Sequence, residues 1–186
     1  MATIEIDKRE FDELVRREFD EEKFVKEASL LGVHWHNVDG NVCEVENYPN
    51  RPDCLSVEGL ARAYRGFFDI ETGRTEYEAE EGEIEVEIEE SVEEVRPHIG
   101  GAVVKNLGLN QKVINGLIQL QEKMHETMGR RRDKLAIGLH DLSTVEPPFI
   151  YKPVEPAKVS FKPLEYDRNM QLEGFLDDHD KCKEYA

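Results

Sequence analysis

Hydrophobic and polar residues alternate at the start of the chain and then change to a helical spacing. Ile4 and Ile6 have polar neighbours on both sides, which predicts a short strand with one buried face. Asp7 and Glu10 then have the spacing of a helix capping box, in which each side chain bonds the main-chain N–H of the other. A short helix through Val15 is therefore expected after the strand.

A second helix and a β-hairpin are predicted next. Asp20 can cap the helix, apolar residues recur in it at helical spacing, and Gly32 supplies a left-handed stop. The segments 34–38 and 41–45 then flank an Asp-Gly pair, the dipeptide best suited to a tight hairpin turn. The start of the chain thus combines small helices with antiparallel strands.

A loop and a buried helix follow the hairpin. Pro52 forces an extended or turn conformation, and Asp53 is placed to cap the helix, which ends near Phe68. Apolar residues then mark one helical face. They are Val57, Leu60, Ala61, Tyr64 and Phe67.

The most acidic part of the chain comes after this helix. Residues 75–94 contain eleven glutamates and no basic residue. Ile84, Val86 and Ile88 alternate with glutamates there, which predicts a strand with one buried and one charged face. We place a domain boundary near residue 75, which divides the chain into a small α+β domain at 1–75 and a second, mixed domain at 76–186.

The second domain is expected to contain further strands and one long helix. Residues 99–104 read as an apolar strand, Asn110 caps the helix, and Gly129 ends it. The residues of this helix that we expect to point inward are Val113, Leu117, Leu120, Met124 and Met128. Residues 135–139 form a continuous apolar run, which predicts a buried central strand.

Shorter elements complete the expected fold, whose class is α+β. Strands are predicted around 149–151 and 159–161. A final short helix through Leu172 and Phe175 follows.

Charge restricts the partners that the chain can attract. It has 186 residues, with 24 Lys and Arg against 41 Asp and Glu, and a formal net charge of -17. Such a surface as a whole repels nucleic acids and anionic membranes. Between residues 96 and 134, however, eight basic residues face three acidic ones, a local balance of +5. Any RNA contact must therefore be local.

Cysteine usage and hydropathy indicate a cytoplasmic protein. Cys43, Cys54 and Cys182 are an odd number at wide spacings and match neither a disulfide framework nor a zinc motif. The sequence has no membrane-spanning apolar run and no signal peptide. No glycine-rich phosphate loop or nucleophile motif is present either, so the sequence provides no catalytic residue of its own.

Two clusters are candidates for RNA contact. Arg130, Arg131 and Arg132 can pair bidentately with phosphates, although arginines at a helix end also favour the helix dipole. His140 and Asp141, at the exit of the expected strand, could orient a water or a ribose hydroxyl, or Asp141 could simply bond main-chain amides. Both interpretations of each cluster stay open.

Other polar residues favour structural roles. Arg51 and Asp53 are expected to form an ion pair that shapes the loop, with direct RNA contact as the alternative. His34 and His36 point to the same face of a strand, but no third ligand accompanies them. We therefore predict no metal site.

Two long motifs are similar to one known family. The first is Asn50, Arg51, Pro52 and Asp53 followed by Leu-Ser-Val-Glu-Gly-Leu-Ala-Arg at 55–62. The second comprises residues 117–125, the Gly-Arg-Arg-Arg sequence at 129–132, and Ala-Ile-Gly-Leu-His-Asp-Leu at 136–142. In this order and spacing they resemble the β chains of archaeal and eukaryotic-type phenylalanyl-tRNA synthetases, and the resemblance covers nearly the whole chain.

The resemblance implies a specific biological setting. It implies a heterotetrameric synthetase in which the α subunit uses ATP and Mg²⁺ to charge tRNA(Phe), while this chain needs no cofactor. It further implies a B1-like first domain and the first part of an editing domain (B3/B4-like), which hydrolyses mischarged tRNA and is incomplete here. Two alternatives remain: a stand-alone deacylase of mischarged tRNA, and an acidic module that binds a basic partner.

Overall fold

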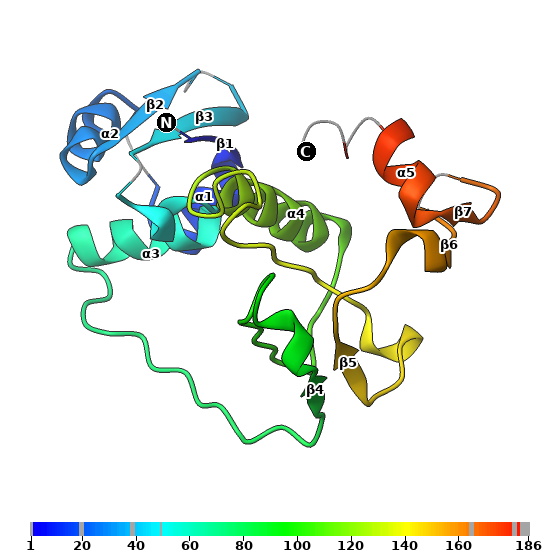
Figure 1. Ribbon diagram of the computed structural model, residues 1–186. Helices are drawn as coiled ribbons and strands as arrows, with labels where there is room; N and C mark the ends of the chain where they lie inside the picture. The colour runs from blue at the N-terminus through cyan, green and yellow to red at the C-terminus, as the bar shows by residue number, and fades with distance from the viewer. Residues whose placement is uncertain are drawn as a thin grey trace. The chain divides into compact units, whose positions relative to one another are not determined.

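The computed structural model describes residues 2–18, 21–37, 40–48, 50–163, 166–179 and 182, and it divides into two units that interleave along the sequence (Figure 1). The first unit comprises Met1–Tyr77 and Gly108–Gly138, and the second comprises Glu78–Leu107 and Leu139–Ala186. The sequence predicted a single division near residue 75. In the structure, residues 108–138 instead return to the first unit.

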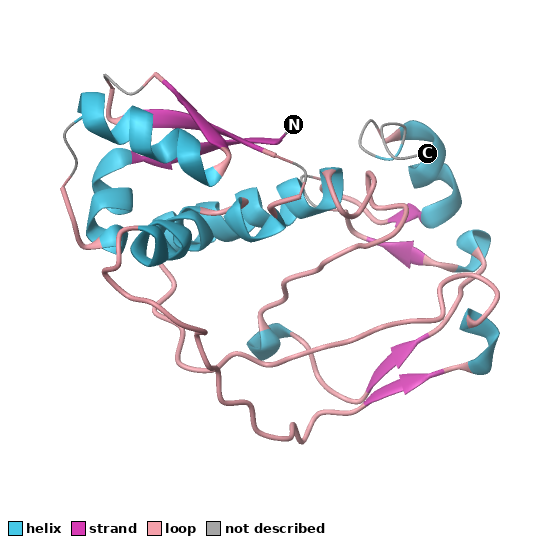
Figure 2. Cartoon of the chain, turned by 90° about the vertical axis from the view of Figure 1, so that its left-hand side faces the viewer, coloured by secondary structure: helices cyan, strands magenta, loops and turns pink. Residues whose placement is uncertain are grey.

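A three-stranded antiparallel sheet organises the first unit (Figure 2). Its strands are β1 (Ala2–Asp7), β2 (Val33–His36) and β3 (Val42–Asn47), in the order β1-β3-β2. Burial alternates along β1 and β3, so one face of the sheet lies in the core. The predicted first strand and the hairpin are confirmed, although the aspartate of the hairpin turn lies outside the described residues.

Three helices cover the buried face of this sheet. They are α1 (Lys8–Val15), α2 (Glu21–Ala28), which continues as a 3-10 turn at Ser29–Leu31, and α3 (Val57–Phe67). Asp7 caps α1, since its Oδ1 accepts the Glu10 N–H at 3.0 Å. Gly32 ends the second helical segment with a left-handed φ of 75°, as predicted. Asp20, the expected cap of α2, lies outside the described residues.

The cap and one core position of α3 differ from the prediction. Ser56 caps the helix by accepting the Gly59 N–H at 3.2 Å, so the assignment of Asp53 as the cap is wrong. Asp53 is engaged with Arg51 instead. Phe67 is 38% exposed, and its neighbour Phe68 packs against the core. A pattern of apolar residues does not settle which of two adjacent aromatic rings turns inward.

An aromatic cluster forms the centre of the core. The ring of Phe11 contacts those of Phe24, Trp35 and Tyr64 with centroids 5.0 to 5.7 Å apart. The buried hydroxyl of Tyr64 accepts the indole N–H of Trp35 at 2.9 Å and donates to the main-chain oxygen of Ala28 at 3.4 Å. Burial raises the pKa of Tyr64, so the ring stays neutral and its hydroxyl keeps the donor role.

The long helix α4 (Gln111–Glu126) belongs to the first unit. Its cap is Asn110, as predicted, with Oδ1 accepting the Val113 N–H at 3.0 Å. Leu117, Leu120 and Met124 are half-buried. Val113 and Met128 are 37% and 48% exposed, so their inward placement was wrong. A helix at the surface of a small unit buries only a narrow stripe.

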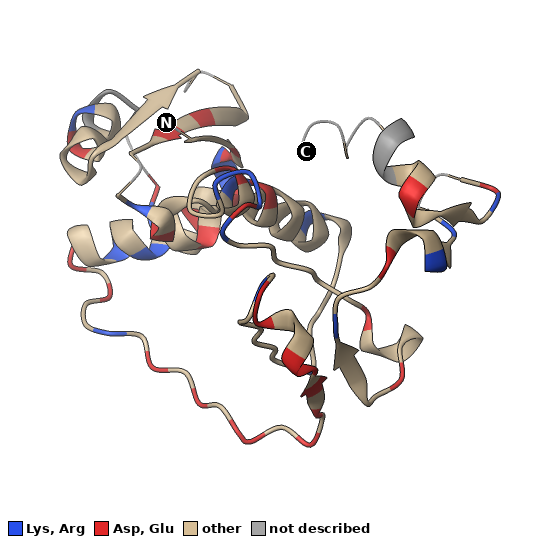
Figure 3. Cartoon of the chain, viewed as in Figure 1, with Lys and Arg blue, Asp and Glu red and all other residues tan. Residues whose placement is uncertain are grey.

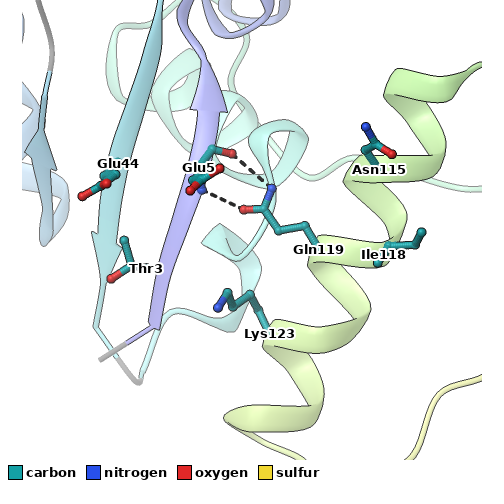
Figure 4. Close-up of a pocket in the computed structure, with 7 residues that line it drawn as sticks. All are labelled: Thr3, Glu5, Glu44, Asn115, Ile118, Gln119 and Lys123. Atoms are coloured by element: carbon teal, nitrogen blue, oxygen red, sulfur yellow. Dashed lines mark hydrogen bonds between the residues drawn. The ribbon is translucent and has the colours of Figure 1, made fainter. Parts of the chain in front are cut away.

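A glutamine attaches α4 to the edge of the sheet. The side-chain amide of Gln119 accepts the main-chain N–H of Glu5 at 2.8 Å and donates to its main-chain oxygen at 3.1 Å, as a neighbouring strand would (Figure 4). An ion pair between Lys112 and Glu10, at 3.3 Å, adds a second contact. The amide thereby satisfies one position on the open edge of β1.

The helices and strands among the described residues of the second unit are all short. Two parallel strands, β4 (Val86–Ile88) and β5 (Phe149–Tyr151), form one sheet, and two antiparallel strands, β6 (Ser160–Phe161) and β7 (Met170–Gln171), form another. The last helix is α5 (Leu172–Asp178). The predicted strands near 149–151 and 159–161 and the final helix are confirmed.

Three expectations for the apolar runs are wrong. The acidic strand β4 forms, but Val86 and Ile88 are 38% and 52% exposed, so its apolar face is not buried among the described residues. Residues 99–104 and 135–139 are not strands. An apolar run becomes a strand only where a partner strand satisfies its main-chain groups, and the described residues supply none. Among the described helices, none combines the length and apolar character needed to cross a bilayer.

Candidate nucleic-acid interface

The loop that follows α4 concentrates positive charge on a strained backbone. We call residues 129–134 the basic loop; Figure 3 shows its blue cluster next to the end of α4. Arg130, Arg131 and Arg132 have φ values of 46°, 57° and 66°. This left-handed conformation costs roughly 1 to 2 kcal/mol per residue for most amino acids, and glycine, asparagine and aspartate adopt it more readily. Three successive arginines in it require support from the surrounding structure.

Gly129 provides part of this support by allowing a close approach of the main chain. A Cβ atom there would lie 2.7 Å from the His125 oxygen and 2.8 Å from the Leu135 oxygen. Main-chain hydrogen bonds close the loop on both sides: Gly129 N–H to the Met124 oxygen at 2.8 Å, and Lys134 N–H to the Gly129 oxygen at 2.9 Å. The glycine therefore fixes the start of the loop in addition to following the helix.

Arg132 ties the loop to α4. Its Nη2 donates to Oε1 of Glu122 at 2.7 Å, and its Nε lies 3.0 Å from Nδ1 of His125. The side chain of His125 is buried, and the main-chain N–H of Ile137 points at its Nε2 at 2.7 Å. N–H donors thus face both ring nitrogens, and because an imidazole accepts at no more than one nitrogen, one of these two approaches is the hydrogen bond.

Arg130 and Arg131 are exposed, in contrast to Arg132. None of the ion pairs between described residues includes either of them. Lys134 pairs with Asp133 at 3.1 Å, so the remaining charge of the loop lies on these two guanidinium groups. The sequence did not indicate Glu122 and His125 as supporting residues, although their spacing of three on a helix placed them on one face.

His140 and Asp141 belong to the second unit, whereas the basic loop belongs to the first. Both residues are exposed, and the buried strand that was to present them is absent. Asp141 accepts from the Ser143 hydroxyl at 2.7 Å and from the Ser143 N–H at 2.9 Å, and it caps the 3-10 turn Leu142–Thr144. These hydrogen bonds hold the pKa of the Asp141 carboxyl below its ordinary value.

The motif at Asn50, Arg51, Pro52 and Asp53 forms a closed turn. Arg51 donates to both carboxylate oxygens of Asp53, at 3.0 and 2.9 Å, and to the Leu31 oxygen at 3.3 Å. The hydrogen bonds from Arg51 hold the pKa of Asp53 below its ordinary value. Burial raises the pKa of the neighbouring Cys54 thiol to about 11, so this cysteine is unreactive at neutral pH.

The two strand histidines are engaged locally. His34 Nε2 lies 2.9 Å from the Tyr48 hydroxyl, and His36 Nε2 lies 3.6 Å from a Glu46 oxygen. Over the described ranges, no three His, Cys, Asp or Glu side chains are close enough together to hold a metal ion.

A hollow lies beside the Gln119 contact, between α4 and the β1 edge. It has a volume of about 550 Å³ and is open to solvent (Figure 4). Six of its seven lining residues have polar or charged side chains: Thr3, Glu5, Glu44, Asn115, Gln119 and Lys123, with Ile118 as the seventh. Two of its carboxylates, those of Glu5 and Glu44, lie on directly opposed residues of β1 and β3, which disfavours an anionic ligand. The basic loop is therefore the better candidate for RNA.

Comparison with known proteins gives a consistent result. The β subunit of phenylalanine–tRNA ligase from Archaeoglobus fulgidus is 46% identical over 167 residues, which are 90% of this chain and 30% of that protein. The β subunit from Methanocaldococcus jannaschii is 38% identical over 190 residues, covering 100% of this chain and 34% of that protein. No protein-family model matches the chain.

A solved structure supports the same relationship. The crystal structure of an N-terminal fragment of the phenylalanyl-tRNA synthetase β-subunit from Pyrococcus horikoshii has a TM-score of 0.89 and 32% identity. The match covers 99% of this chain and 54% of that chain. The chain spans about a third of the length of its curated relatives. Over most of its length, the chain is thus a homologue of the N-terminal region of phenylalanine–tRNA ligase β subunits.

Proposed function

We propose that the chain serves as the N-terminal region of a phenylalanine–tRNA ligase β subunit and contributes to tRNA binding in protein synthesis. The observation that carries this proposal is the similarity over 90 to 100% of the chain, joined to the structural match. In this proposal an α subunit is the partner and performs aminoacylation with ATP and Mg²⁺. The proposal also includes a cytoplasmic location.

The basic loop is the part of the first unit that we assign to RNA. Arg130 and Arg131 present guanidinium groups to solvent, and phosphates pair with such groups bidentately. At physiological salt the Debye length is about 8 Å, so the acidic remainder of the chain is largely screened at the loop. A local basic site can therefore bind RNA on a chain of charge -17.

We assign the second unit to part of an editing domain that removes wrongly attached amino acids from tRNA. Support comes from the similarity of this segment to the same relatives. His140 and Asp141 remain candidates for contact with the tRNA end, because both are exposed. The stand-alone deacylase is not favoured, since the relatives are ligase subunits. The acidic module is not favoured either: the comparisons support the same subunit assignment for the segment that carries the glutamates.

Replacing Arg130, Arg131 and Arg132 together by Gln is expected to weaken tRNA(Phe) binding and to flatten its salt dependence. Each lost phosphate contact reduces the slope of log affinity against log salt by about 0.7 to 0.9, so one to three contacts are expected to disappear. Filter binding over a KCl series measures both quantities. Circular dichroism checks that the helices persist.

A matched control removes the same charge elsewhere. Lys152, Lys158 and Lys162 are exposed, and their replacement by Gln also removes three positive charges. This variant is expected to retain the parent slope. If the arginine variant is folded and binds with the affinity and slope of the parent, the basic loop does not contact RNA.

The chain alone is expected to show no phenylalanine-dependent pyrophosphate exchange. The reason is that its sequence contains no ATP-binding motif, and the proposal assigns adenylate formation to the α subunit. Radiolabelled exchange with purified chain, with and without added α subunit, measures this. Exchange by the chain alone, in preparations that contain no α subunit, would contradict the division of labour.

A further inference from the structure

The three arginines of the basic loop are not equivalent. Arg132 is bonded to Glu122 at 2.7 Å and to His125 at 3.0 Å, and its side chain is 29% exposed. Arg130 and Arg131 are exposed, and no ion pair among the described residues engages them. A guanidinium pairs with phosphate through a fork of open N–H groups. Arg132 has committed part of its fork to the protein, whereas the other two retain theirs.

Charge pairing strengthens the distinction. The carboxylate of Glu122 neutralises Arg132 at short range, so this arginine contributes little net field to an approaching phosphate. It therefore accounts for few of the counterions that RNA binding releases. No ion pair between described residues includes Arg130 or Arg131, so these two are expected to account for most of the released counterions.

The backbone indicates that stability is not what Arg130 and Arg131 supply. Both residues hold a left-handed φ, 46° and 57°, which asparagine or glycine adopts at lower cost. Their side chains are exposed, so burial does little to offset this cost. Strained residues of this kind concentrate at functional sites, where the surrounding structure maintains the strain. Here the surrounding structure is Gly129, His125 and the Arg132 contacts.

We propose that residues 130–132 form a strained phosphate-contacting turn with a division of roles. Arg130 and Arg131 contact the phosphates of the RNA backbone. Arg132 is a positioning residue, which holds the turn against α4 through Glu122 and His125. The inference rests on the proposed function, in that RNA must bind at this loop. It adds which residues meet the RNA and which one shapes the loop.

Single variants separate the two roles. Arg130→Asn and Arg131→Asn are each expected to leave the thermal midpoint unchanged or raised, because asparagine tolerates the left-handed region. Each is expected to weaken binding of a tRNA(Phe) transcript several-fold and to lower the salt slope by about 0.7 to 0.9. The thermal midpoint would therefore stay the same or rise while the affinity for the transcript falls.

Replacing Arg132, which holds the loop against α4, is expected to change the thermal midpoint and the affinity but not the salt slope. Arg132→Gln is expected to lower the thermal midpoint and to weaken binding while the salt slope stays that of the parent. The double variant Glu122→Gln with Arg132→Gln keeps the net charge of the chain, and it is expected to behave like the single variant. The salt slope is the readout that a purely structural effect does not move.

The outcomes distinguish this inference from the proposed function. If Arg132→Gln lowers the salt slope as much as Arg130→Asn does, Arg132 is itself a contact, and the division of roles is wrong while RNA binding by the loop stands. If the asparagine variants keep parent affinity and slope and only Arg132→Gln weakens binding, the assignment is reversed. If no variant changes binding, the loop does not bind RNA, and the proposed site fails as well.

Discussion

Gly59→Ala is expected to destabilise the first unit by about 3 kcal/mol, near the upper end of the usual cost of overpacking. A Cβ atom at this position would collide with the main-chain oxygen of Asp53. That oxygen belongs to the 3-10 turn Pro52–Cys54, which the Arg51 contacts and the buried Cys54 hold in place. A main-chain atom cannot rotate out of the way, so either the turn or α3 must shift. Urea denaturation measures the loss.

Gly66→Ala is the matched control, because it makes the same change seven residues later in the same helix. Gly66 is exposed, and the nearest atom to its added Cβ would be the Glu71 oxygen at 3.9 Å. Alanine is the better helix former, so this variant is expected to gain roughly 0.5 to 1 kcal/mol. Opposite signs for the two variants are the expected result. Equal stability of Gly59→Ala and the parent would show that α3 does not pack on the turn as described.

Leu60→Ala is expected to cost about 2 to 5 kcal/mol, the range for removing a buried leucine side chain. Leu60 is 0% exposed and lies in the same core cluster as Phe11, Val45 and Tyr64. Its loss leaves a cavity in this cluster, and the contact between the rings of Phe11 and Tyr64 limits how far the cluster can collapse. The midpoint of urea unfolding, followed by the fluorescence of Trp35, reports the change.

Arg62→Ala is the control for Leu60→Ala. Arg62 lies two residues further along α3 and is exposed, so its replacement is expected to change the free energy of unfolding by less than about 0.5 kcal/mol. A change of that small size for Leu60→Ala would mean that the apolar face of α3 is not buried.

The sequence predicted helix caps, helix ends and the first strand correctly where one residue type and its neighbours decide the structure. Asp7 and Asn110 cap the helices that they were expected to cap, and Gly32 takes the left-handed conformation at the expected stop. The alternation of Ile4 and Ile6 correctly predicted a half-buried strand. These signals depend on hydrogen bonds and steric limits within a few residues, so they need no knowledge of distant contacts.

The sequence was less informative where two nearby polar residues could each cap the same helix. Both Asp53 and Ser56 have side chains that cap helices, and the sequence favoured the wrong one because it did not show that Arg51 already engages Asp53. The arginine cluster was found from its charge alone. The contacts of Arg132 could not be predicted, because Glu122 and His125 become its partners only after the loop turns back on α4.

By itself the sequence determined the caps of α1 and α4, the N-terminal strand and hairpin, most of the buried faces of the N-terminal helices, and the place where positive charge gathers. Only the tertiary structure decided that 108–138 joins the first unit, through the amide of Gln119 on the edge of β1. It also decided that 99–104 and 135–139 are not strands. The physical reason is that a run of apolar residues indicates only that the segment favours burial. A strand also requires a partner strand for its main-chain N–H and C=O groups, and that partner comes from residues far away in the chain.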